Sequence, residues 1–385
     1  MTDGPRQLHD AMAARVAAGE LPGVVTVLAR GDEVHVDAIG SHDFDGETPM
    51  SRDTLFRIAS MTKPMLATVT MMLVEDGLLD VTEPVDRWLP ELANRRVLAR
   101  IDGPVDETVP AHRPITLDDL LTFRMGFGML TEPEFNPPFP IVAAAESLEL
   151  TLAQPDPRTP HPPDEWMRRF GTLPLMYQPG ERWLYNTGSL VLGVLVARAA
   201  GAPLGEVMRA RLFEPLGMRD TGFSTDPANL HRIPNYSFNN ESISPPELWA
   251  TEPVFPSGSG GLLSTVDDFL AFARLLRDGG RDLLSAKSVE LLTTNHLTRA
   301  QIETGGMLLE PKGWGYGMGV AAGPDEVSEI PGRYGWDGGY GTVWFNDPHR
   351  DLIAFALTQR SEFLFAGGRT EFIALALQAA GDTKK

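Results

Sequence analysis

An apolar run without any charged side chain begins just after Lys63 and predicts a buried helix. Residues 64–74 carry no charged side chain. Pro64 suits an early helical turn, because its missing N–H leaves no hydrogen bond unmade there. We therefore expect a helix that begins near Ser60 and runs, buried, to about Asp76 and Gly77.

Strand-like patterns occur near both ends of the chain. Residues 23–30 and 33–39 are rich in β-branched side chains and flank a turn, which predicts a hairpin preceded by a short helix at 8–18. Residues 314–321, 341–345 and 352–357 are also strand-like, with a turn at 346–350. A final helix is expected at 370–380, ending at Gly381.

The middle of the chain predicts helical pieces and no convincing strand pair. Thr116 to Asp119 has the form of a capping box, and a cap at 264–267 opens a helix that closes at Gly279 and Gly280. The simplest architecture is α+β: an antiparallel sheet flanked by helices, built from residues 1–85 and 250–385. Residues 86–249 then form a mostly helical inserted domain.

Residues 133–163 hold nine prolines alongside Phe135 and Phe139, and Trp166 follows shortly after. We expect an irregular apolar loop near a pocket, because a loop of this length is more often functional than inert. A disordered surface excursion is the alternative.

Composition excludes several classes of function. The chain has 385 residues, 42% of them hydrophobic, so it can bury a substantial core. A net charge of −19 argues against a nucleic-acid or anionic-membrane partner. There is no cysteine, and neither a secretory signal nor a run of membrane-spanning length is apparent. A cytoplasmic enzyme is the expectation, and the sequence leaves the oligomeric state open.

Ser60 and Lys63 are the strongest candidates for chemistry. They stand three residues apart at the start of the apolar helix, so their side chains should project side by side. Burial would lower the pKa of the lysine and let its amine accept a proton, which makes the neighbouring hydroxyl a candidate nucleophile. In the alternative interpretation, Ser60 only caps the helix and Lys63 covers apolar neighbours with its stem.

Other catalytic motifs are missing. No serine lies in G-x-S-x-G, and the glycine-rich segments fit neither the dinucleotide nor the phosphate-loop pattern. The eight histidines form no close metal pair. We therefore expect neither a metal nor another cofactor.

Three segments in chain order resemble the serine β-lactamase and penicillin-binding-protein superfamily. The resemblance spans about residues 8 to 380 and is strongest to its class C-like branch, which contains the family VIII carboxylesterases. The segments are Ser60-Met61-Thr62-Lys63, Tyr185-Asn186-Thr187 and Trp336-Asp337-Gly338-Gly339, the last expected before a strand.

The resemblance implies an acyl-enzyme mechanism. Ser60 would attack the carbonyl carbon, and Lys63 and Tyr185 would share the general-base and general-acid work. The backbone amides of Ser60 and Gly339 would form the oxyanion hole. In the alternative interpretation, Tyr185 is an ordinary core tyrosine and the glycine run a plain turn.

Departures from the family pattern bear on the substrate. Thr187 stands where these enzymes commonly carry the asparagine of Tyr-x-Asn, with Asn186 one position earlier. Trp336 replaces the usual lysine or histidine of the third motif, and Asp337 would repel an anion. Trp336, Asp337, Gly338 and Asn186 are the expected substrate-binding residues.

A carboxylesterase acting on neutral esters of short or medium acyl groups is the expected function. The alternatives are a β-lactamase or D-Ala-D-Ala carboxypeptidase-like hydrolase, which share the acylation step, and a binding paralogue without turnover. The expected partner is a small-molecule ester.

Overall fold

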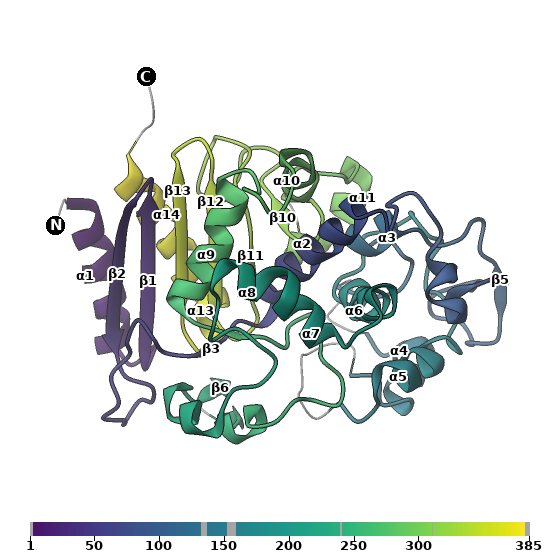
Figure 1. Ribbon diagram of the computed structural model, residues 1–385, viewed down its shortest axis with the longest axis horizontal. Coiled ribbons are helices and arrows are strands. Elements are labelled where there is room, and N and C mark those ends of the chain that lie inside the picture. Colours follow the sequence, from purple (N-terminus) through teal and green to yellow (C-terminus); the bar gives the residue numbers. More distant parts are fainter. Residues whose placement is uncertain (1–2, 132–136, 152–158, 239–240, 310, 382–385) are drawn as a thin grey trace.

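An antiparallel sheet of seven strands organises the described part of the chain. The computed structural model describes residues 3–131, 137–151, 159–238, 241–309 and 311–381. The strands follow the order β2-β1-β13-β12-β11-β10-β9 (Figure 1). Their bounds are β1 Gly23–Arg30, β2 Glu33–Gly40, β9 Gly313–Trp314, β10 Gly319–Val320, β11 Tyr334–Gly338, β12 Thr342–Asp347 and β13 Leu352–Leu357.

Both ends of the chain contribute to this sheet, as the sequence predicts. The hairpin β1-β2 pairs Arg30 with Glu33 across its turn, and β1 then pairs with β13, so that Val25 lies opposite Leu357. The expected α+β class with an antiparallel sheet is confirmed.

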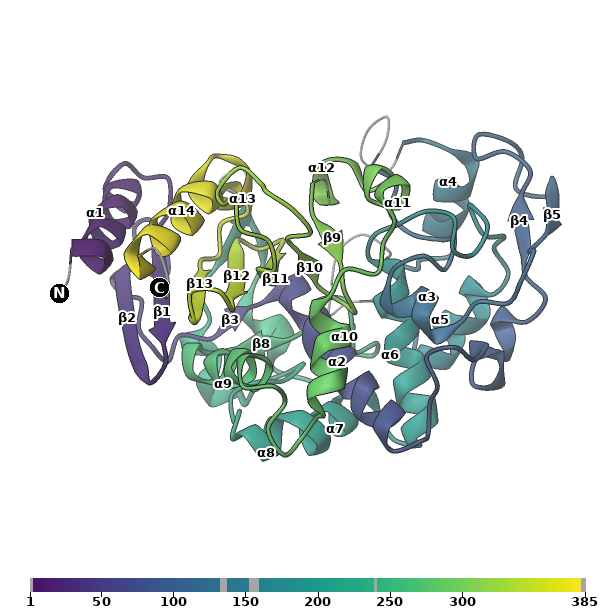
Figure 2. The same cartoon turned by 90° about the horizontal axis from the view of Figure 1, so that it is seen from above.

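Helices cover both faces of the sheet because its central strands are apolar on both sides. α1 (Asp3–Ala17) and α14 (Gly368–Ala380) pack together on one face, against Val343 and Phe345 (Figure 2). The alternate residue Trp344 points to the other face, where it packs with Phe269 of α9 (Val266–Arg277). α2 (Thr62–Glu75) belongs to the same large core, with twelve of its residues buried.

The segment between the two sheet-forming ends is mostly helical, and its part up to residue 200 lies to one side of the sheet (Figures 1 and 2). The predicted capping box is present in this segment: Thr116 and Asp119 exchange hydrogen bonds at the first turn of α3.

The domain boundaries at 85/86 and 249/250 stay a prediction. The α-helices of this segment are α3 Leu117–Leu121, α4 Pro140–Ser147, α5 Pro163–Phe170, α6 Thr187–Ala200, α7 Leu204–Met208 and α8 Glu214–Leu216.

Short strand pairs within this segment were not expected. β4 (Arg96–Leu98) pairs with β5 (Thr108–Pro110), and β6 (Tyr236–Phe238) pairs with β7 (Glu241–Ser244). Pairs of three or four residues give too short an alternation to be visible in the sequence.

The proline-rich segment is more regular than predicted. Part of it, 133–136 and 152–158, lies outside the described residues. The described part contains α4, which starts at Pro140, a position where proline is tolerated. The single strand expected at 314–321 is instead two short strands, β9 and β10, separated by a turn in which Gly317 has a φ of +76°.

In the described regions, no individual helix is long and apolar enough to cross a bilayer. α6 and the helical segment from Leu204 to Leu216 pass that test only as a pair bent by 77°.

Candidate active site

Ser60 lies in a 3₁₀ turn, Ala59–Met61, which leads directly into α2. Ala59 has a φ of +45°, a conformation that costs a non-glycine residue energy and is often kept at functional sites. This residue turns the chain from the buried strand β3 (Phe56–Arg57) into the helix. Ser60 is therefore half-buried at the N-terminal end of a buried helix, with its side chain beside that of Lys63.

Lys63 lies in contact with the Ser60 hydroxyl. Its Nζ is 2.9 Å from Ser60 Oγ and donates a hydrogen bond of 2.6 Å to the carbonyl oxygen of Ser259. The side chain is only 1% exposed. Burial lowers the pKa of this amine well below its ordinary value, because the charged form loses its hydration.

Tyr185 completes a group of three polar side chains. Its phenol accepts a hydrogen bond of 2.7 Å from Trp336 Nε1. The Lys63 amine lies 4.6 Å from the centre of the phenol ring. Burial raises the pKa of Tyr185 above its ordinary value, and the nearby Ser60 hydroxyl and the Trp336 donor offset only part of this rise.

A strained turn orients Tyr185. Asn186 has φ +78° and ψ −56°, and the amide of Thr187 donates to the carbonyl of Tyr185 across it, which defines a γ-turn with positive φ. The Tyr185 carbonyl also accepts from the amide of Met129. Asn186 is buried at the start of α6, and the prediction that its side chain binds substrate stays a prediction.

Aromatic rings surround Tyr185 and keep its phenol away from water. The ring centroids of Phe123, Trp183, Trp314 and Trp336 all lie between 5.5 and 6.4 Å from that of Tyr185. Of these four rings, only Trp336 belongs to one of the three motifs, and the other three come from separate segments that no pattern linked to the site.

The third motif precedes strand β12, as expected, and its first three residues also form the end of β11, a strand that was not predicted. A Cβ built on Gly338 would lie 2.3 Å from the carbonyl oxygen of Ile58, so glycine at this position lets β11 approach the segment just before Ser60. Gly339 is exposed, and a Cβ there would meet no atom within 4 Å. The predicted oxyanion-hole residues thus come from neighbouring segments.

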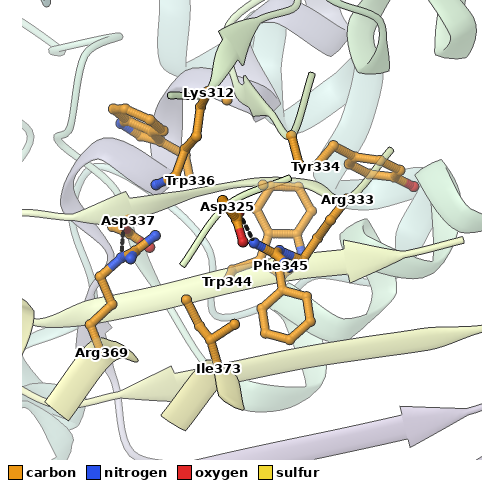
Figure 3. A pocket seen from close by; sticks show the side chains of 13 residues that line it. Lys312, Asp325, Arg333, Tyr334, Trp336, Asp337, Trp344, Phe345, Arg369 and Ile373 are labelled. Carbon is orange, nitrogen blue, oxygen red and sulfur yellow. Dashed lines mark hydrogen bonds and ion pairs between the residues drawn. The ribbon is translucent and has the colours of Figure 1, made fainter. Parts of the chain in front are cut away.

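Asp337 does not share the face of Trp336, because side chains alternate along a strand. It lies opposite Val343 on the face covered by α14, where Arg369 Nε donates to its carboxylate at 2.5 Å. Figure 3 shows this pair below β11, with Trp336 on the other side of the strand. The carboxylate of Asp337 is thus paired with Arg369 on the face of β11 opposite to Trp336, and the expectation that Asp337 binds substrate stays a prediction.

Lys312 is a cation near the site that no motif indicated. Its Nζ lies 5.8 Å from the centre of a Trp336 ring, and both residues line a cavity of about 30 Å³ (Figure 3), room for one water molecule. Burial, with the nearby Arg369, lowers the pKa of Lys312 to about 8. No cluster of three or more His, Asp or Glu side chains in the described ranges could hold a metal ion.

The loop whose Ser259 carbonyl binds the Lys63 amine is a further part of the site that no sequence pattern predicted. This loop consists of residues 257–261, to which the sequence patterns above assign no role. A Cβ on Gly258 would lie 2.6 Å from Leu66 of α2 and 2.9 Å from the carbonyl oxygen of Ser189. Glycine therefore allows the loop to fit between two helices, and this places the Ser259 carbonyl on the Lys63 amine.

Comparison with known proteins agrees with this arrangement. A sequence model of the Beta-lactamase family matches residues 8–378. The chain belongs to the Beta-lactamase family. The resemblance to the serine β-lactamase and penicillin-binding-protein superfamily is thereby confirmed.

Individual relatives cover nearly the whole length of this family member. Protein Rv1367c of Mycobacterium tuberculosis is 39% identical over 363 residues, 89% of this chain and 86% of its own. Esterase EstB of Burkholderia gladioli is 29% identical over 366 residues, 88% of this chain and 86% of its own. The structure of EstCE1, described as a hydrolase with promiscuous acyltransferase activity, superposes with a TM-score of 0.81 at 24% identity, covering 97% of this chain and 98% of its own. The family has esterase and acyltransferase members and supports hydrolase activity for this chain.

Proposed function

We propose that this protein is a serine carboxylesterase that forms an acyl-enzyme on Ser60 and acts on neutral esters of short or medium acyl groups. The observation that carries the proposal is the Ser60 hydroxyl, which lies 2.9 Å from the buried Lys63 amine and close enough to the Tyr185 phenol to lower its pKa. A hydroxyl between two proton-transferring groups is equipped for nucleophilic attack.

Lys63 is the group that takes the proton from Ser60. Its amine has a lowered pKa and is therefore available in the neutral form, which has a lone pair to accept the proton. Tyr185 is not suited to this first step, because its raised pKa keeps the phenol protonated at neutral pH. This assigns an order that the sequence alone left open.

Tyr185 is the proton donor to the leaving alcohol. Its phenol contacts the Ser60 hydroxyl, so it lies beside the bond that breaks when the tetrahedral intermediate collapses. The proton that Lys63 received then returns to Tyr185 through the group formed by Ser60, Lys63 and Tyr185. In the second half-reaction, an incoming water or alcohol gives up its proton to that group and attacks the acyl carbon.

The oxyanion is stabilised by the backbone amides of Ser60 and Gly339. The first amides of a helix have no intrahelical partner and lie at the positive end of the helix dipole, which favours a negative oxygen near Ser60. Gly339 is exposed, and a Cβ built on it would meet no atom within 4 Å, which leaves room for the substrate carbonyl beside its amide.

The preference for neutral esters rests on Trp336. The indole supplies a neutral donor at the position where the resemblance leads one to expect a lysine or histidine, so no third-motif cation is present to bind a substrate carboxylate. The name of the EstB relative, an esterase at 29% identity, supports the same substrate class.

Transfer of the acyl group to an alcohol other than water is a second candidate activity. It uses the same acyl-enzyme and is favoured by the described acyltransferase activity of the structural neighbour EstCE1. Release of an alkyl ester when a primary alcohol is added to the assay would reveal it.

A side-by-side assay with a chromogenic butyrate ester and a chromogenic cephalosporin tests the proposal. Faster turnover of the ester, abolished in Ser60→Ala, supports it. Preferential turnover of the cephalosporin would instead indicate a β-lactamase or carboxypeptidase-like enzyme, and inertness to both a binding paralogue.

A further inference from the structure

The turn that carries the Gly339 amide is held by hydrogen bonds on both sides of that residue. Gly338 to Gly341 form a tight turn between β11 and β12, closed by the amide of Gly341, which donates 2.9 Å to the carbonyl of Gly338. This carbonyl belongs to the same planar peptide as the Gly339 N–H, so the bond restrains the direction of that N–H.

The next peptide is held from outside the turn. Ser361 Oγ donates a hydrogen bond of 2.5 Å to the carbonyl of Gly339. The Tyr236 hydroxyl lies 2.7 Å from the same Ser361 oxygen. A serine hydroxyl has one proton, so Tyr236 must be the donor to Ser361. Burial raises the pKa of Tyr236, which keeps the phenol protonated in this role.

The Ser361 hydroxyl makes this bond instead of capping a helix. It stands at the N-cap position of α13 (Glu362–Phe365), where a serine side chain usually accepts from the helix amides. No such cap bond is present, and the hydroxyl instead contacts a carbonyl 22 residues away in the sequence. Helix capping thus does not account for this serine.

Tyr236 also contacts the turn through its ring. It stacks on Tyr340, the residue after Gly339, with centroids 4.2 Å apart and an interplanar angle of 26°. Tyr236 and Ser361 are each 4% exposed, so water competes little for their hydroxyls.

One buried arginine joins both supports to the segment before Ser60. Arg57 is 1% exposed and donates 2.6 Å to the carbonyl of Pro234 and 2.6 Å to that of Ser244, on either side of the β6-β7 hairpin that contains Tyr236. It also donates 3.0 Å to the side chain of Gln359, two residues before Ser361.

We propose that Ser361 and Tyr236 are positioning residues for the oxyanion hole. Together they fix the carbonyl of Gly339 and so hold this residue in one conformation, in which the N–H of Gly339 points at the oxygen of the reacting carbonyl. A glycine can adopt many backbone conformations, so this residue needs outside support to present its N–H in one direction. Preorganised donors are what make an oxyanion hole effective. The inference rests on the proposed function.

The test compares four variants: Ser361→Ala, Ser361→Thr, Tyr236→Phe and the double variant Ser361→Ala/Tyr236→Phe. Tyr236→Phe keeps the stack on Tyr340 and removes only the hydroxyl. The readouts are kcat and KM for the butyrate ester and the rate at which a p-nitrophenyl phosphonate modifies Ser60, followed by mass spectrometry. The phosphonate forms a tetrahedral adduct whose oxygen occupies the same hole, so this rate does not depend on ester turnover.

Ser361→Ala is expected to lower both kcat and the phosphonylation rate by about 10-fold to 100-fold, less than the ~10²–10³-fold typical of losing an oxyanion donor outright. KM should change less than twofold, because the ester carbonyl is bound more weakly than the tetrahedral oxyanion. Ser361→Thr, which keeps the hydroxyl, should recover most of the rate. Tyr236→Phe should be milder, and the double variant no worse than Ser361→Ala, because both hydroxyls act through one chain.

Unchanged kcat and phosphonylation in Ser361→Ala would overturn the inference. So would failure of Ser361→Thr to recover the rate in a folded protein, or losses that add in the double variant. Failure of the proposed function looks different: wild-type protein that is phosphonylated at Ser60 but does not turn over the ester refutes the esterase, while the phosphonylation rates of the variants still decide the role of Ser361.

Discussion

Trp336 Nε1 donates a hydrogen bond of 2.7 Å to the phenol oxygen of Tyr185. The resemblance leads one to expect a cation at the position of Trp336, which would lower the pKa of a neighbouring phenol. A neutral indole donor stabilises the phenolate far less, and the pKa of Tyr185 stays raised by burial. Tryptophan at position 336 is thus consistent with the proposed roles, in which Lys63 accepts a proton and Tyr185 donates one.

Replacing Trp336 by phenylalanine should separate this hydrogen bond from the packing of the ring. We expect Trp336→Phe to lower kcat about 10-fold, because the Tyr185 phenol loses the hydrogen bond that orients it as a proton donor. The change in KM should be smaller. Trp314→Phe is the matched control, since its indole belongs to the same aromatic cluster but donates to the carbonyl of Leu121. Equal losses in the two variants would assign the effect to packing.

Removal of the Lys63 amine should abolish activity without unfolding the protein. Lys63→Met has a similar volume, and its apolar side chain suits the buried site. We expect kcat/KM to fall by ~10³-fold or more, as for other residues that act as a catalytic unit. Steady-state kinetics alongside thermal melting measures both effects, and near-normal turnover by this variant would refute the assigned role.

Lys63→Met should also change how stability depends on pH. The folded pKa of Lys63 lies well below its ordinary value of 10.5, so between these two values the unfolded chain binds more protons than the folded one. Stability of the wild type therefore rises with pH across this window. The variant should be the more stable protein at neutral pH, with the difference shrinking towards pH 10.5. A constant difference in melting temperature across pH would contradict this.

The pH profile of ester hydrolysis should have one acidic limb. Activity is expected to fall as the pH drops through the folded pKa of Lys63, because the protonated amine cannot accept the Ser60 proton. No loss is expected on the alkaline side up to pH 10, the ordinary pKa of tyrosine, because that of Tyr185 is raised. Lys312, with a pKa of about 8, is the other candidate for the limb, and an unshifted limb in Lys312→Met would exclude it.

Two adjacent glycines should respond differently to alanine. Gly338→Ala would place a Cβ 2.2 Å from Thr342 Oγ1 and 2.3 Å from the Ile58 carbonyl, so we expect a loss of stability of about 1–3 kcal/mol together with activity. Gly339→Ala meets no atom within 4 Å and should fold normally. Its effect should appear as a lower kcat/KM for the ester. Equal melting temperatures for the two variants would contradict the close approach of β11 to Ile58.

The pattern of the sequence predicts most of the sheet and the polar centre of the site. Strands β1, β2 and β13 and helix α2 have long, uniform apolar patterns, and these four elements were predicted to within a few residues. Lys63 was recognised because a lone cation in an apolar run needs a partner, and the Ser60 hydroxyl and the Ser259 carbonyl provide two.

The remaining parts of the site depend on contacts between distant segments. Asp337 belongs to the third motif, yet strand alternation turns its side chain towards Arg369 of α14, 32 residues away. This direction was not predicted because the motif was expected to precede a strand. Ser361 and Tyr236 have no motif at all, since their only shared feature is the Gly339 turn that they contact from different elements.

The central claim is that the Ser60 hydroxyl, activated by the buried Lys63 amine, carries the acyl group. Rapid quenching of the enzyme during turnover of the butyrate ester, followed by peptide mass spectrometry, tests it most directly. We expect one butyryl group on the peptide that contains Ser60 in the wild type, and none in Ser60→Ala or Lys63→Met. A butyryl group on another residue, or acylation of Ser60 at the wild-type rate in Lys63→Met, would contradict it.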